Sequence, residues 1–206
     1  MRKSIGLLFL TAAAMLAQYK MEPTGPPPLE VAPGMVEKLQ KEGVRVTGAK
    51  GVFCEIWLVS QAPSGPKNAE EAVDLPTIPQ GAFAGVIRFP AKGEDRRGQG
   101  IKPGVYALRY SLYPVNGDHQ GVAPQRDFLL MTPAAEDKDP AAAPGFDDLV
   151  KMSRKASGTP HPAVLSTSQS RNSKQPDLTH EESTWTLHLK MGEVAIAIIV
   201  IGRAEG

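Results

Sequence analysis

The chain has 206 residues, a formal net charge of +1 and a single cysteine, Cys54. The near-neutral charge gives no electrostatic footprint for nucleic acid or for an anionic membrane surface, so neither is expected as a partner. One cysteine cannot form an intramolecular disulfide, and stability must come from a hydrophobic core, which a chain of this length can bury in one domain. The 20 glycines and 19 prolines separate short apolar runs, a composition typical of an all-β domain.

The N-terminus has the order of residues found in an export signal. Arg2 and Lys3 precede an apolar run over 5–16, and small residues follow up to Ala17. The run is shorter than the roughly 20 residues that cross a bilayer, which favours a cleaved signal peptide over a retained membrane anchor. Cleavage after Ala14 or after Ala17 fits the pattern. We expect residues 1–17 to be removed and the released chain to be soluble, periplasmic or secreted, and without a membrane span.

A Pro-rich leader with a short helical turn is expected over 18–43, followed by a single β domain over 44–206. Both faces of the segment 52–60 are mostly apolar, with Glu55 as the exception, which predicts a central strand. A turn at Met191-Gly192 predicts a hairpin between the last two strands. Strands are predicted at 44–46, 52–60, 83–89, 105–113, 127–131, 163–165, 184–190 and 193–201.

One helix is predicted over 146–156. Asp147 and Asp148 lie at its start, basic residues near its end, and Gly158 just beyond it, which matches the capping and macrodipole rules. The polar segment 166–183 is expected to be a long loop. These elements predict a mainly β fold, an antiparallel β-sandwich of about 7–8 strands with the helix packed at an edge or end. A small closed barrel is the alternative.

The known catalytic and metal-binding motifs are incomplete. His180 begins an H-E-x-x-H pattern, but Thr184 stands where the second histidine should be. Cys54 lacks the nearby His and Met ligands of a blue-copper site, which favours a buried core thiol. The acidic loop that contains Glu136, Asp137 and Asp139 fits a solvated loop better than a Ca²⁺ site. We therefore predict no metal and no cofactor, and assign no catalytic residue.

The segment 116–127 holds the densest group of functional residue types. His119 titrates near neutrality and can serve as a proton shuttle or ligand, with Asp118 or Asp127 to orient it. The alternative is a polar loop in which Arg126 and Asp127 satisfy backbone groups, and this alternative is favoured.

Three charged residues are predicted to lie in the middle of strands. If the faces that carry Arg88 and Arg109 are covered, these arginines must be paired, with Glu55 or Asp127 as candidate partners. The candidate binding residues are thus Glu55, Arg88, Arg109, Asp118, His119, Arg126 and Asp127.

Four segments resemble a family of uncharacterised exported bacterial proteins: FCEIWLV (53–59), GVIRFP (85–90), KPGVYALRY (102–110) and GDHQGVAPQRDFLL (117–130). The resemblance extends over residues 45–165. It implies a secreted or periplasmic protein, and it transfers no site residue because no site is assigned in that family.

Three functions are compatible with the sequence. The favoured hypothesis is a binding module at the cell envelope, with an envelope glycan, a small ligand or a protein as partner. The alternative is a hydrolase or metal-dependent enzyme that uses His119 with Asp118 and Asp127. The third is a structural envelope component, which predicts a large exposed apolar patch or an uncovered sheet edge.

Overall fold

The computed structural model describes residues 18–115 and 125–203. Ten strands form one antiparallel sheet in the order β1-β2-β3-β4-β7-β8-β9-β12-β11-β10, and β5 and β6 form a separate two-stranded ribbon. The strands are β1 (Lys20–Thr24), β2 (Gly43–Gly48), β3 (Gly51–Leu58), β4 (Phe83–Phe89), β5 (Gly93–Glu94), β6 (Gly100–Ile101), β7 (Gly104–Leu112), β8 (Asp127–Pro133), β9 (Val164–Gln169), β10 (Asp177–Glu181), β11 (Thr184–Met191) and β12 (Val194–Ile201).

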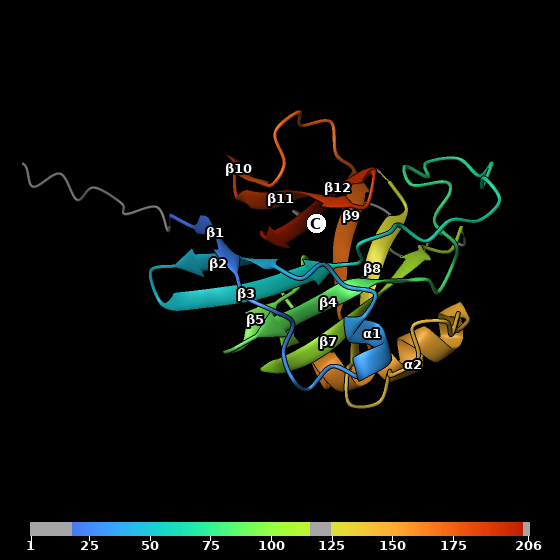
Figure 1. The fold of residues 1–206 in the computed structure, drawn as a ribbon, viewed down its shortest axis with the longest axis horizontal. Helices are drawn as coiled ribbons and strands as arrows, with labels where there is room; N and C mark the ends of the chain where they lie inside the picture. Colours follow the sequence, from blue (N-terminus) through green and yellow to red (C-terminus); the bar gives the residue numbers. More distant parts are fainter. Residues whose placement is uncertain (1–17, 116–124, 204–206) are drawn as a thin grey trace, which may run out of the picture.

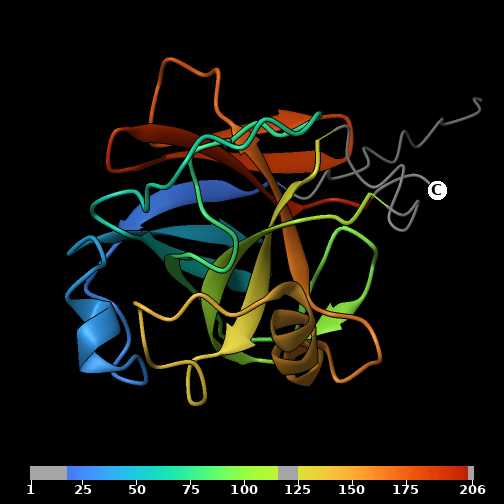
Figure 2. The same ribbon diagram turned by 90° about the vertical axis from the view of Figure 1, so that its right-hand side faces the viewer.

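The ten-stranded sheet curls until its two end strands, β1 and β10, contact each other, so the fold is a nearly closed barrel (Figures 1 and 2). The mainly β prediction is confirmed, but the sandwich of 7–8 strands is wrong. Alternating apolar residues show which strands bury a face, and a sandwich and a barrel bury the same faces. The order of strand pairing, which separates the two architectures, is not encoded in that alternation.

The strand register places one apolar side chain after another on the inner face of the barrel. Val44 is partly buried and the other interior side chains named here are buried, and each buried one contributes about 1.5–3 kcal/mol by leaving water. Strand by strand from β2 they include Val44, Ile56, Ile87, Leu108, Leu129, Leu165, Ile198 and Leu187. Much of the outer face is also covered, which explains why Trp57 on that face of β3 is 2% exposed.

Two helices pack outside the barrel. Helix α2 (Phe146–Ser157) confirms the predicted helix, and it ends at Gly158, whose φ of 70° is the left-handed conformation of a glycine C-cap. The helix lies against β8 (Figure 2), and its buried Leu149 belongs to the same apolar cluster as Phe128 of β8 and Val164 of β9. Helix α1 (Pro33–Val36) is a single turn within the leader over 18–43, where a short helical turn was predicted. The chain before α1 also covers β3, because the Trp57 indole N–H donates to the Gly25 carbonyl at 2.8 Å.

Two strands of the ten-stranded sheet lie where loop or leader was predicted. β1 contains Pro23, which lacks an N–H but is tolerated because β1 is an end strand. β9 extends to Gln169, and β10 falls inside the predicted loop 166–183. β10 is the other end strand of the sheet, and its residues are mostly polar. Its hydrogen-bonded pairing with β11, rather than an apolar pattern, gives it strand conformation. The predicted hairpin of β11 and β12 is confirmed, with Gly192 at a φ of 59° in its turn.

Candidate functional site

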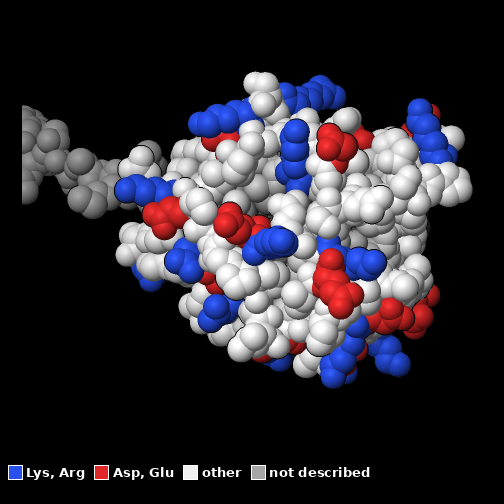
Figure 3. Space-filling view, in the orientation of Figure 1, with Lys and Arg blue, Asp and Glu red and all other residues white. Residues whose placement is uncertain are grey.

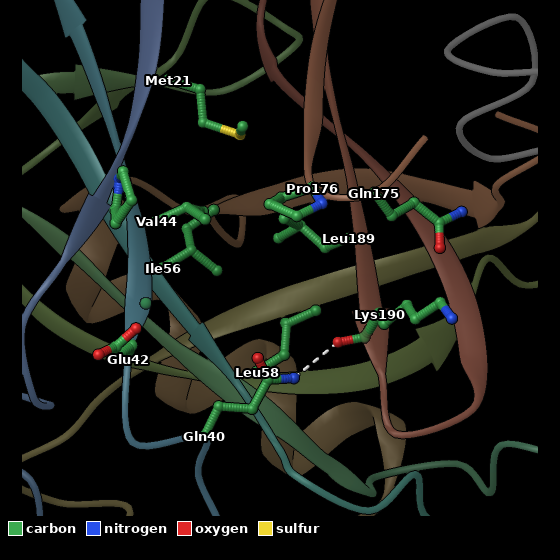
Figure 4. Close-up of a pocket in the computed structure, with 12 residues that line it drawn as sticks. Met21, Gln40, Glu42, Val44, Ile56, Leu58, Gln175, Pro176, Leu189 and Lys190 are labelled. Carbon is green, nitrogen blue, oxygen red and sulfur yellow. Dashed lines mark hydrogen bonds between the residues drawn. The ribbon is translucent and has the colours of Figure 1, made fainter. Parts of the chain in front are cut away.

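A cavity of about 400 Å³ opens where the two ends of the sheet meet (Figure 4). β1, β2 and β3 form one wall, and β11 with the residues that lead into β10 forms the other. We call this cavity the seam pocket. Its apolar lining includes Met21, Pro23, Val44, Ile56, Leu58, Pro176 and Leu189.

The seam pocket exists because β1 and β10 contact each other along only part of the seam. There, Tyr19 packs edge-to-face on Trp185 with 5.4 Å between ring centroids, and the His180 ring stacks on Trp185 at 4.3 Å. Toward the other end, β10 begins at Asp177, opposite His188, so β11 continues past the start of its partner. The interior side of the barrel is therefore open to solvent along this part of the seam.

One hydrogen bond crosses the open part of the seam. Gln40 Nε2 donates to the Lys190 carbonyl at 2.7 Å, and also approaches the Val59 carbonyl at 3.4 Å (Figure 4). Both amide hydrogens of Gln40 are thus engaged within the protein. This side chain ties β11 to the segment before β2 and bounds the pocket.

The rim of the seam pocket carries one charge of each sign. Glu42 and Lys190 are exposed and line opposite walls. The face shown in Figure 3 likewise has acidic and basic side chains interspersed. An apolar interior with a balanced rim favours an uncharged, apolar occupant over an ion.

The structure places Glu55 and Arg88 together on the outer face of the barrel. Glu55 is 3% exposed and accepts hydrogen bonds from Thr24, Arg45 and Arg88, which lie on neighbouring strands. The Arg45 Nη2 to Glu55 Oε1 distance is 2.6 Å. The Arg88–Glu55 pairing was one of the predicted alternatives and is confirmed. Both carboxylate oxygens of Glu55 have partners, so this side chain links β3 to β1, β2 and β4.

Arg109 pairs with neither predicted partner. Its guanidinium is fully buried, donates twice to the Asp137 carboxylate, and donates to the carbonyls of Gly81, Asp139 and Ala142. All five guanidinium hydrogens are therefore used. Arg109 holds the loop before α2 onto the outer face of β7, which is a structural role.

Asp127 is buried and accepts three hydrogen bonds. The donors are the backbone N–H groups of Asp74 and Leu75, at 2.8 and 2.9 Å, and the Tyr110 hydroxyl at 2.7 Å. Burial and the neighbouring Asp127 carboxylate raise the pKa of Tyr110 well above its ordinary value. Arg126 points elsewhere, to Glu70 and the Tyr113 carbonyl. Asp127 thus anchors the loop between β3 and β4.

The predicted site residues fall into separate structural groups. Glu55 and Arg88 share one, Arg109 belongs to a second, and Arg126 and Asp127 anchor neighbouring loop contacts. Asp118 and His119 lie outside the described residues. None of the placed candidates lines the seam pocket.

The residues considered for metal binding do not lie together in the described ranges. Within 18–115 and 125–203, no three His, Cys, Asp or Glu residues lie close enough to hold a metal ion. Asp137 of the acidic loop is engaged by Arg109, and Glu136 pairs with Lys155. Cys54 is buried, and burial together with the nearby Glu55 raises its pKa far above the ordinary thiol value.

Residues of the seam pocket were not predicted as a site. Val44, Ile56 and Leu189 are apolar strand residues, and such residues indicate a core in any β domain. Gln40 and Lys190 meet across 150 positions of sequence, and only the closure of the barrel brings them together. The sequence offered no direct signal, because Gln40 lies in the polar stretch 40–42 that precedes β2.

None of the helices within the described residues is both long and apolar enough to cross a membrane. No family model, curated protein or solved structure matches this chain.

Proposed function

We propose that the protein is an exported binding protein that takes an uncharged, mostly apolar small molecule in the seam pocket. The observation that carries the proposal is an apolar cavity of about 400 Å³ that is open to solvent along the seam. Ligand sites in proteins commonly have volumes of about 300–1,000 Å³ and mostly apolar walls, and the mouths of β-barrels are frequent locations. Export rests on the charged, apolar and small residues over 1–17.

A small ligand is favoured over the other two kinds of partner. Glycan sites use exposed aromatic faces, whereas the Trp185 ring is stacked on His180 and abutted by Tyr19. A structural envelope component is expected to show a large exposed apolar patch or an uncovered sheet edge, and the edge that β10 leaves uncovered is limited to the end of β11 beyond His188. In the described part of the chain, the exposed large hydrophobic side chains are Leu29 and Val115, which do not make a patch of that size.

The hydrolase alternative gains no support from Asp127. Its carboxylate already accepts hydrogen bonds from Tyr110 and from two backbone N–H groups, so it is committed to holding a loop. A carboxylate that orients a catalytic histidine needs an acceptor oxygen directed at the imidazole.

Binding of the uncharged fluorescent probe N-phenyl-1-naphthylamine tests the proposal. We expect a saturable rise in fluorescence that decanol reverses by competition. Val44→Phe places a ring in the cavity, and we expect the affinity to fall at least about tenfold. Val115→Phe is the matched control, because Val115 is 79% exposed and does not line the pocket. Absence of saturable binding, or equal losses in both variants, would overturn the proposal.

A further inference from the structure

A second, smaller cavity lies between α2 and the outer face of the barrel, on the side away from the seam. Its volume is about 130 Å³, and its floor includes Tyr113, Phe128 and Val164. The Tyr113 and Phe128 rings stack with 4.2 Å between centroids and 14° between planes. A flat apolar floor of this kind suits a planar or branched apolar group.

The walls of this cavity are held by hydrogen bonds. Ser153 on α2 donates its hydroxyl to the Ala163 carbonyl at 3.0 Å and accepts from the Ala163 N–H at 2.9 Å, which fixes the helix against β9. At the end of the helix, the Ser157 hydroxyl donates to the His161 carbonyl at 2.7 Å, and the Thr159 hydroxyl accepts from the His161 N–H at 3.1 Å. The tight turn over 158–162 therefore has a defined conformation beside the cavity, and the site is preformed.

Three basic side chains line the cavity: Arg97, Arg154 and His161. Arg97 Nη2 donates to the Pro162 carbonyl at 2.6 Å, while its Nε is buried without a hydrogen-bond acceptor in the part of the chain that the structure describes. The Arg97 side chain is 20% exposed, so part of its guanidinium reaches the edge of the cavity.

The acidic partner of Arg97 beside this cavity is Asp95. Asp95 lies 3.5 Å from Arg97 Nη2, and its oxygens also accept hydrogen bonds from the backbone of Arg97 and from Gln99. The acidic residues of α2, Asp147 and Asp148, are in its first turn, whereas Arg154 is in its last. The cavity is therefore apolar at its floor and positively charged at its edge.

We propose that this cavity binds a small carboxylate that carries a single ring or a short branched chain. The cavity volume of about 130 Å³ is slightly below the roughly 150 Å³ of a cavity known to hold one benzene ring, which limits the apolar group to a single ring or a short branched chain against the stacked rings. The carboxylate then lies at the edge, where it pairs with the exposed part of the Arg97 guanidinium and is attracted by Arg154. Charge-assisted hydrogen bonds of this kind are short and about twice as strong as neutral ones.

Titration of the purified protein with benzoate and with benzamide, followed by NMR chemical shifts, tests the proposal. The two probes share their size and ring but differ in charge. We expect benzoate to shift the resonances of Phe128 and Val164 and to bind at least about tenfold more tightly than benzamide, one charge-assisted hydrogen bond being worth about that factor. Equal affinities, or shifts that do not include these residues, would overturn the proposal.

Two exposed residues of α2 make a matched pair of variants. Arg154→Gln removes a charge at the cavity and is expected to weaken benzoate binding several-fold, while leaving benzamide binding unchanged. Lys151→Gln removes the same charge from the same helix at a position that does not line the cavity, and is expected to leave both affinities unchanged. Equal losses in the two variants would show a general electrostatic effect and would contradict the site.

Discussion

Asp137→Asn tests whether the buried guanidinium of Arg109 depends on a carboxylate partner. The Arg109 side chain is 0% exposed and that of Asp137 is 4% exposed. Asparagine keeps the shape of aspartate but removes its charge and turns one acceptor into an N–H₂ donor that faces the guanidinium. Loss of one partner of a buried ion pair costs about 3–5 kcal/mol. Because Arg109 retains three carbonyl acceptors, we expect a loss near the lower limit, about 3 kcal/mol.

Urea unfolding followed by tryptophan fluorescence measures this loss. For m values of about 1–3 kcal/mol/M, a loss of 3 kcal/mol lowers the midpoint by about 1 M or more. Glu136→Gln is the control, because Glu136 and its partner Lys155 have side chains 44% and 58% exposed. An exposed pair contributes at most about 1 kcal/mol. If Asp137→Asn shifted the midpoint no more than Glu136→Gln, the structural role assigned to Arg109 would be refuted.

Further predictions concern a histidine, the cysteine and the seam. Burial lowers the pKa of His188, so the unfolded chain binds more protons than the folded one between the two pKa values. Stability should fall as the pH drops below about 6.5, and less so in His188→Gln, which thermal unfolding between pH 7 and 5 measures; parallel profiles would contradict this. Cys54 should react with a disulfide reagent far more slowly in the native protein than in denaturant; equal rates would refute its burial. Gln40→Ala should weaken probe binding in the seam pocket by loosening the contact with Lys190; unchanged affinity would show that this contact does not shape the pocket.

The sequence predicted local elements well where apolar residues alternate. The strand predicted at 83–89 agrees with β4, and the helix at 146–156 differs from α2 by one residue. Alternation is a local property, and these segments carry it strongly. β10 was not predicted because its residues are polar and its strand conformation depends on pairing with β11.

Contacts between distant segments were only partly predictable. Glu55 and Arg88 were considered as partners because each is a charge in an apolar strand, and such charges must be paired. Arg109 required a partner by the same reasoning, but Asp137 lay in a loop that resembled a solvated one. The seam pocket depends on the closure of the barrel, which no local pattern specifies.

The most direct test of the proposed function is methyl NMR of the protein during titration with decanol. The account predicts saturable shifts at the methyl groups of Val44, Ile56, Leu58 and Leu189, which line the seam pocket from both walls. It also predicts unchanged shifts at Val164, which lies beside α2. Shifts confined to Val164, or no saturable shifts at the four seam methyl groups, would contradict the claim that the seam pocket is the binding site.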